Sequence, residues 1–241
     1  MFDSSILKNE EKISFALRSL YSRFGYERYK MGKFEEYDLY VRNKDFLISD
    51  SIITFTDTNG RLMALKPDVT LSIIKNVTDT EGTVNKFYYD ENVYRISGGT
   101  NSFKEIAQTG LECIGDIGEY EIAEVVCLAI KSLATIDSNY ILDISHAGLV
   151  SAVFETIGIE NDEKKDILMY IRSKNISQLL VMKDNGKLSE GAFDLISKLM
   201  CTYKNIADFK AAFAPYSYDK KISTSLNEFT TVCDKLTALG M

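Results

Sequence analysis

The sequence has few prolines, a single histidine and no long apolar run. Its two prolines, together with 45% hydrophobic and 26% charged residues, exclude a disordered, collagen-like or mucin-like chain. No window approaches the ~18 consecutive apolar residues that cross a membrane. The opening MFDSSILKNEEK also lacks a basic segment followed by an apolar core. We therefore expect a cytoplasmic protein with no membrane partner.

The shortage of metal-ligating residues excludes the common zinc sites. Cys113, Cys127, Cys201 and Cys233 form no CxxC pair, and His146 is the only histidine. Catalysis by a Cys-His or Ser-His pair would depend on His146, and no G-x-S-x-G motif accompanies it. We expect reduced thiols, no metal, no cofactor and no catalytic residue.

The charge balance is acidic, with 35 acidic and 28 basic residues and a formal net charge of -7. Such a chain repels phosphate backbones unless its basic residues gather into a patch, so we expect no nucleic-acid partner. The 241 residues are enough for one large domain, or for one domain and a smaller companion.

Apolar periodicity predicts helices that alternate with antiparallel strands up to about residue 150. Asn59-Gly60 between two apolar runs predicts a hairpin over residues 51–66. The first expected helix is capped by Asp3, Ser4 and Ser5, has its apolar residues between 13 and 24, and is ended by Gly25. We also expect a short helix capped by Asp68, a helix over 119–136, and strands over 26–31, 84–89, 93–96, 103–114 and 140–144. Helical periods dominate afterwards. The expected fold class is α+β, with a core over residues 1–150 and a helical region over residues 151–241.

A row of polar residues follows one face of the strand over residues 103–114. Gln108, Gly110 and Glu112 share a face because side chains alternate along a strand. Arg95 joins the same row if the preceding strand is in register through the turn at residues 97–102. Since Gly110 has no side chain, a small molecule could lie on the backbone there.

The chemistry of this row suits a zwitterion. The Arg95 guanidinium pairs with a carboxylate, while Glu112 and the nearby Asp68 accept hydrogen bonds from an ammonium group. An amino acid or a nucleotide has these features. The alternative is a solvated sheet face on which Arg95 and Glu112 form a weak surface pair. Similarly, the glycine-rich segment 97–102 is either a phosphate cradle or a plain turn.

Four segments resemble the histidyl-tRNA synthetase superfamily of class II synthetases. LKPDVTLSIIKN (residues 65–76) matches its core, and KFYYDENVYRISGG (86–99) with FKEIAQTGLECIG (103–115) resembles motif 2. FGYERYKMGKFEE (24–36) resembles motif 1, although Gly32 stands where the family has proline. The resemblance implies a class II synthetase-like antiparallel sheet flanked by helices, followed by a small helical insertion region.

Within this superfamily, the departures favour the synthetase-like regulatory subunits of ATP phosphoribosyltransferase. Residues 67–70 read Pro-Asp-Val-Thr where synthetases read Pro-Glu-Gly-Thr, and His146 and Gly148 match a Gly-His-x-Gly element of the regulatory subunits. Arg95 is followed by Ser97, whereas synthetases have a glutamate there that meets adenine. The alternative is a divergent or truncated histidyl-tRNA synthetase.

Motif 3 and the Arg-Gly-Leu-Asp-Tyr-Tyr-like run of the superfamily are not found in the sequence, and neither is an anticodon-binding domain. We therefore expect either a fragment or a natural short form.

The resemblance implies a regulatory, non-catalytic subunit in histidine biosynthesis that senses L-histidine and activates a short catalytic subunit. Asp68, Thr70 and Gln108 would face the amino group of histidine, Arg95 its carboxylate and Glu112 its imidazole. Because motif 1 lines a dimer interface in the superfamily, the resemblance also implies a homodimer within a hetero-oligomer.

Overall fold

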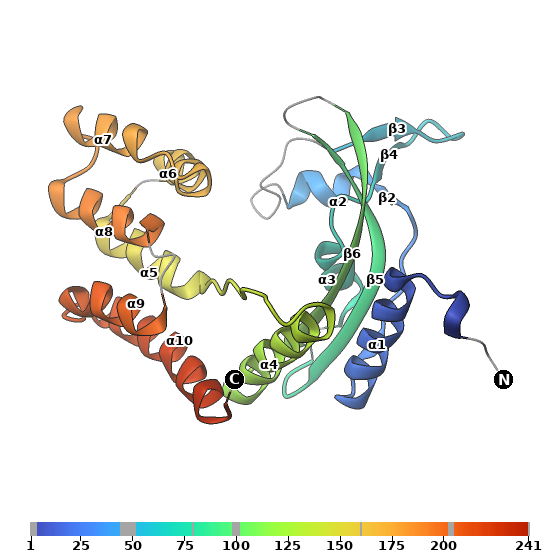
Figure 1. Cartoon of the computed structure of the whole chain (residues 1–241). Coiled ribbons are helices and arrows are strands. Elements are labelled where there is room, and N and C mark those ends of the chain that lie inside the picture. The colour runs from blue at the N-terminus through green and yellow to red at the C-terminus, as the bar shows by residue number, and fades with distance from the viewer. Residues whose placement is uncertain are drawn as a thin grey trace. The chain divides into compact units, whose positions relative to one another are not determined.

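The computed structural model describes residues 4–43, 52–78, 80–97, 102–159, 161–201 and 205–240. Contacts divide the chain into two units, residues 1–140 and 141–241, whose helices and strands Figure 1 shows. Each unit has its own hydrophobic clusters. The boundary expected near residue 150 stays a prediction. No helix of the described segments is long and apolar enough to cross a membrane.

The first unit is built on a long antiparallel hairpin of β5 (Val84–Ile96) and β6 (Phe103–Gly115), which Figure 1 shows as one bent ribbon. Its register runs from Val84 opposite Gly115 to Ile96 opposite Phe103. The prediction of two strands over 84–96 is wrong, because pairing with β6 continues through the polar stretch 90–92. The two-residue strand β1 (Glu27–Arg28) pairs in parallel with β5, giving the order β1-β5-β6.

A smaller antiparallel sheet has the order β2-β4-β3, with β2 at Phe34–Glu36, β3 at Thr54–Thr56 and β4 at Leu62–Leu65. The hairpin predicted from Asn59-Gly60 is confirmed between β3 and β4. The carboxylate of Asp57 accepts hydrogen bonds of 2.8 Å from the backbone N–H groups of Asn59 and Arg61. Gly60 has a φ of +80°, a conformation that glycine adopts without strain.

Helices pack on both faces of the β5–β6 hairpin. On one face, Leu17 and Tyr21 of α1 (Asn9–Arg23) and Leu128 of α4 (Glu119–Ile136) form one buried cluster with Tyr88. On the other face, Ile73 of α3 (Thr70–Asn76) belongs to the cluster that covers β5. The helix α2 (Tyr37–Arg42) lies beside the smaller sheet. Each face of the hairpin therefore has its own core.

The predicted start of the first helix is wrong. The helix α1 begins at Asn9, and Glu11 accepts a hydrogen bond of 2.9 Å from the backbone N–H of Lys8. Ser4 and Ser5 lie instead in a short 3-10 helix (Ser4–Ile6), and Asp3 lies outside the described residues. The bond from Lys8 to Glu11 satisfies the N–H of the residue before the helix and is the glutamate half of a capping box. The predicted stop is confirmed, since Gly25 follows the helix with a φ of +80°.

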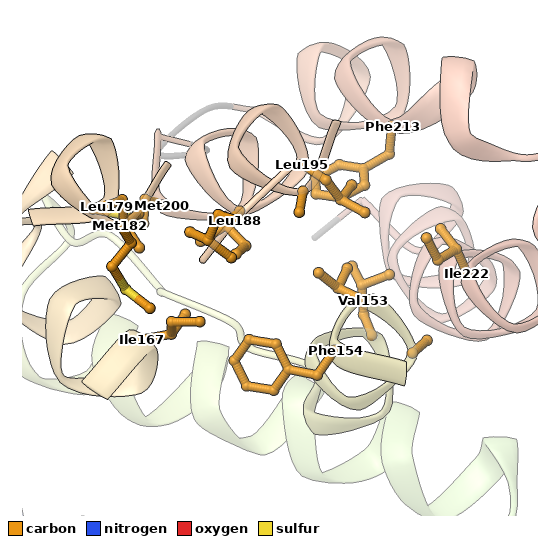
Figure 2. Packing of buried hydrophobic residues seen from close by; sticks show 14 of the residues in the cluster. Val153, Phe154, Ile167, Leu179, Met182, Leu188, Leu195, Met200, Phe213 and Ile222 are labelled. Atoms are coloured by element: carbon orange, nitrogen blue, oxygen red, sulfur yellow. The ribbon is translucent and has the colours of Figure 1, made fainter. Parts of the chain in front are cut away.

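The second unit is helical, as predicted. Its helices are α5 (Ala147–Ile157), α6 (Asn161–Ser173), α7 (Ile176–Asp184), α8 (Glu190–Cys201), α9 (Ile206–Phe213) and α10 (Lys220–Ala238). Figure 2 shows their apolar side chains meeting in one cluster, with Val153, Ile167, Leu195 and Ile222 among the labelled residues. With the sheets of the first unit, these helices confirm the α+β class.

The strand predicted over residues 140–144 is wrong. This stretch has no regular secondary structure, and Ile141 is 86% exposed. A strand needs a partner for its backbone groups, and none pairs with this stretch within the described ranges.

Candidate functional site

The predicted polar row lies on one face of the β5–β6 hairpin. Tyr89 pairs with Gly110, and Arg95 pairs with Lys104. Because residues two apart share a face, Arg95 lies on the same side as Gln108 and Glu112, as the sequence predicted. The register therefore gathers the candidate residues of both strands on the face that α3 covers.

Glu112 meets the start of α3. Its carboxylate accepts a 2.5 Å hydrogen bond from the Thr70 hydroxyl. Asp68 precedes the same helix, and its carboxylate accepts a 3.1 Å bond from the backbone N–H of Leu71. Burial raises the pKa of Glu112, and the Asp68 carboxylate adds to the rise, while the Thr70 hydrogen bond opposes it. The structure therefore brings Asp68, Thr70 and Glu112 into one group of acceptors.

Gln108 carries a buried oxygen without a partner. Its Nε2 donates to the Tyr89 hydroxyl at 3.3 Å, whereas no group in the described segments donates to its Oε1. A buried amide oxygen in this state is free to accept a hydrogen bond from a ligand. Burial, Glu112 and Asp68 together raise the pKa of Tyr89 to about 12. Tyr89 is therefore protonated at neutral pH and able to donate.

Arg95 reaches the loop before α3. Its Nε donates to the Pro67 carbonyl oxygen at 2.9 Å. The guanidinium also opposes the rise in the pKa of Tyr89, so it acts on the same group. The parts of the chain that the structure describes contain no ion pair between Arg95 and Glu112. The alternative of a surface Arg-Glu pair is therefore wrong, since Arg95 bonds to Pro67 and Glu112 to Thr70.

The reason proposed for Gly110 is also wrong. A Cβ built at Gly110 would lie 2.3 Å from the Tyr89 hydroxyl oxygen and 2.4 Å from the ring carbon that carries it. The tyrosine side chain thus covers the backbone on which a small molecule was expected to lie. Glycine is needed here because an aromatic side chain on the paired strand occupies the space.

Three further residues border the site and were not predicted. Lys66 and Glu91 form an ion pair of 2.6 Å, and Tyr40 is 1% exposed with no hydrogen-bond partner for its hydroxyl in the described part of the chain. Burial raises the pKa of Tyr40, with contributions from Glu35 and Asp68. Counting the register from the turn would have identified Glu91 opposite Gln108. No local sequence pattern distinguishes Lys66 from a surface lysine, and none distinguishes Tyr40 from an ordinary core tyrosine.

Residues 98–101 of the proposed phosphate cradle lie outside the described residues, so both interpretations of this segment stay predictions. In the described ranges, no group of three His, Cys, Asp or Glu residues could hold a metal ion. Cys113, Cys127 and Cys233 are free thiols.

Comparison with known families gives a match to the histidyl-tRNA synthetase family over residues 4–240. One relative, the ATP phosphoribosyltransferase regulatory subunit of Oceanobacillus iheyensis, is 28% identical. The alignment covers 78% of this chain and 47% of the relative. The protein of the same name from Clostridium kluyveri is 27% identical, with coverage of 97% and 61%. A histidine–tRNA ligase of Methanococcus maripaludis is 26% identical, with coverage of 79% and 48%. The chain spans about half to three fifths of these relatives.

Solved structures share the fold. A Bacillus halodurans protein described as an ATP phosphoribosyltransferase regulatory subunit/histidyl-tRNA synthetase has a TM-score of 0.68 at 23% identity, and the match covers 100% of this chain and 64% of that one. A chain of the ATP phosphoribosyl transferase (HisG:HisZ) complex from Thermotoga maritima has a TM-score of 0.61 at 18% identity, with coverage of 91% and 76%. Both likenesses support the class II synthetase-like architecture.

Proposed function

Because this chain belongs to the histidyl-tRNA synthetase family, we propose that it acts as a regulatory, non-catalytic subunit of ATP phosphoribosyltransferase in histidine biosynthesis. In this role it senses L-histidine and activates a separate short catalytic subunit. Two relatives with this name, in Oceanobacillus and Clostridium, support the proposal.

The observation that carries the proposal is the group of acceptors at the start of α3. Asp68, Thr70 and the unpartnered Oε1 of Gln108 suit an ammonium group, which has three donors. The half-buried Glu112 suits an imidazole N–H. Arg95, which donates to the carbonyl of Pro67 next to Asp68, suits the carboxylate of the same ligand.

The departure at Ser97 supports a regulatory role over aminoacylation. Ser97 follows Arg95 where the resemblance implies a glutamate that meets adenine. A serine hydroxyl has no negative charge, so it is a weaker hydrogen-bond acceptor than the carboxylate that it replaces. Histidine would then act by linkage, since it changes activity only if it binds one state of the complex better than another. The coupling free energy in such systems is ~1 to 3 kcal/mol.

The proposed partners are the short catalytic subunit and a second copy of this chain. The Thermotoga structure is described as a complex of two components, HisG and HisZ, which supports partnership with a catalytic subunit. The homodimer rests on the resemblance of residues 24–36 to motif 1.

The test is an assay of phosphoribosyl transfer to ATP by a short-form catalytic subunit with and without this chain. We expect activity to rise on addition of the chain, and L-histidine to reduce it. Glu112→Gln should still activate but should need about tenfold more histidine for inhibition, because the amide cannot match a charged acceptor. Activity that does not depend on the added chain would overturn the proposal.

A divergent or truncated histidyl-tRNA synthetase is the second candidate, favoured by the match to the Methanococcus ligase. It requires ATP and Mg²⁺ and predicts histidine-dependent exchange of pyrophosphate into ATP. Absence of this exchange in the full-length gene product would exclude it.

A further inference from the structure

Two lysine–glutamate ion pairs of equal length lie on opposite faces of the β5–β6 hairpin. Lys66 and Glu91 meet at 2.6 Å on the face of the candidate site, with side chains 1% and 17% exposed. Lys86 and Glu124 also meet at 2.6 Å, on the face covered by α4, and are 22% and 6% exposed. The second pair serves as a control for the first, because its length is the same and it lies on the face away from the candidate site, although its lysine is more exposed and also lies over the rings of Tyr26 and Tyr120.

Lys66 joins the smaller sheet to the hairpin. Its backbone N–H donates to the Lys33 carbonyl at 3.1 Å, and its own carbonyl accepts from the N–H of Tyr94 at 2.9 Å. The next residue, Pro67, accepts the Nε–H of Arg95. The side-chain bond to Glu91 is therefore one of several bonds that hold this short crossing against β5.

The ion pair is the bond whose loss should disturb the crossing most. An ammonium group that is almost fully buried has lost its hydration, and it is stable only while an opposite charge meets it. Without the Glu91 charge, the Lys66 ammonium group is more stable nearer to water, and its movement there would pull on the crossing. Pro67 is covalently bonded to Lys66, so its carbonyl oxygen would move away from Arg95.

We propose that Glu91 is a positioning residue for the ligand site. It holds Lys66, Lys66 holds the Pro67 carbonyl in place, and this carbonyl sets the direction of the Arg95 guanidinium. In this role Glu91 acts through Lys66, the residue to which its carboxylate bonds. The inference rests on the proposed function in one respect, namely that Arg95 binds the carboxylate of histidine.

The binding test uses calorimetry on the full chain with L-histidine and with histamine, which has the ammonium and imidazole groups but no carboxylate. Glu91→Gln should weaken histidine binding about tenfold and histamine binding much less, since Arg95 meets only the carboxylate. Glu124→Gln should leave the ratio of the two affinities unchanged. Equal loss for both ligands, or no loss, in folded Glu91→Gln would overturn the proposal.

A second measurement does not depend on histidine. The Nε–H signal of Arg95, assigned in nitrogen-15 spectra by its disappearance in Arg95→Lys, should exchange slowly with water while it is bonded to Pro67. We expect faster exchange in Glu91→Gln and no change in Glu124→Gln. Unchanged exchange in Glu91→Gln would overturn the inference, whereas a wild-type chain that fails to bind histidine would overturn the proposed function alone. If Glu91→Gln does not fold, Glu91→Asp keeps the charge with a shorter reach and should give an intermediate exchange rate.

Discussion

At the scale of single residues, Glu112 has two conflicting roles. The half-buried carboxylate is costly in the free protein, because partial burial raises its pKa and Asp68 raises it further. The same negative charge is what a bound imidazole or ammonium group would compensate. A protein with such an empty charged site is less stable than one with an uncharged site. Ligand binding then raises the free energy of unfolding again.

This conflict predicts a pH-dependent effect of Glu112→Gln. The folded chain holds the Glu112 proton more tightly than the unfolded chain, so the free energy of unfolding falls as pH rises above the ordinary glutamate value of 4.5. The fall ends above the raised pKa. Glutamine keeps an acceptor for Thr70 and has no charge to bury, so the variant should gain more stability relative to wild type at pH 7 than at pH 4. Urea unfolding at both pH values is the measurement, and an equal difference at both would contradict it.

Gly110 gives a prediction about packing. Alanine there would place Cβ against the Tyr89 hydroxyl and ring, so Gly110→Ala should destabilise the first unit by about 1 to 3 kcal/mol. Gly32→Ala is the control, because its nearest neighbour would be an atom at an ordinary 3.6 Å. Thermal unfolding of both variants decides, and equal melting temperatures would show that Tyr89 moves aside at little cost.

The residues of the site were only partly predictable. Strand alternation placed Gln108 and Glu112 on one face, and this was confirmed because the period of two needs no knowledge of packing. The contact of Tyr89 with Gly110 depends on the register across the turn. The pairing of Lys66 with Glu91 depends on how two sheets meet, which no local pattern encodes.

At the scale of elements, the helix α5 explains why a histidine and a glycine occur two residues apart. The Nδ1 of His146 accepts a 3.0 Å hydrogen bond from the backbone N–H of Leu149 and so caps the helix. A Cβ at Gly148 would lie 2.8 Å from the Cε1 of this ring. Glycine thus leaves room for the capping side chain, and the His-x-Gly pattern has a structural role within the second unit.

The free energy of unfolding of variants at this cap should depend on whether the hydrogen bond to the Leu149 N–H is kept. His146→Ala removes the acceptor and should cost about 1 kcal/mol, whereas His146→Asn supplies a side-chain oxygen at the same end and should cost much less. Gly148→Ala should resemble His146→Ala, since it displaces the ring. Chemical unfolding followed by circular dichroism compares them, and an equal loss for the alanine and asparagine variants would argue against capping.

Periodicity predicted the elements better than their ends. The helix over residues 119–136 and the long strand from 103 were confirmed, because both have long, regular apolar patterns. The start of α1 was wrong because a glutamate caps it from inside the helix. The strand over 140–144 was wrong because an apolar run becomes a strand only beside a partner.

At the scale of the whole molecule, the two units have separate cores. Residues of the proposed histidine site all belong to the first unit, whereas Ile167 is fully buried in the cluster of the second. Ile167→Ala should therefore destabilise the second unit by about 2 to 5 kcal/mol and leave histidine affinity unchanged. Differential scanning calorimetry with and without histidine measures both effects. A large loss of histidine affinity would mean that the two units are energetically coupled.

The strand order β1-β5-β6 leaves β6 with one neighbour within the described segments. Along its 13 residues, the other edge presents backbone N–H and C=O groups that could pair with a further strand, from the same polypeptide or from another molecule. The net charge of -7 gives copies of the chain a mutual repulsion that opposes pairing between molecules through this edge. Salt screens this repulsion and leaves the open edge unchanged, so the colloidal stability of the chain should fall as ionic strength rises.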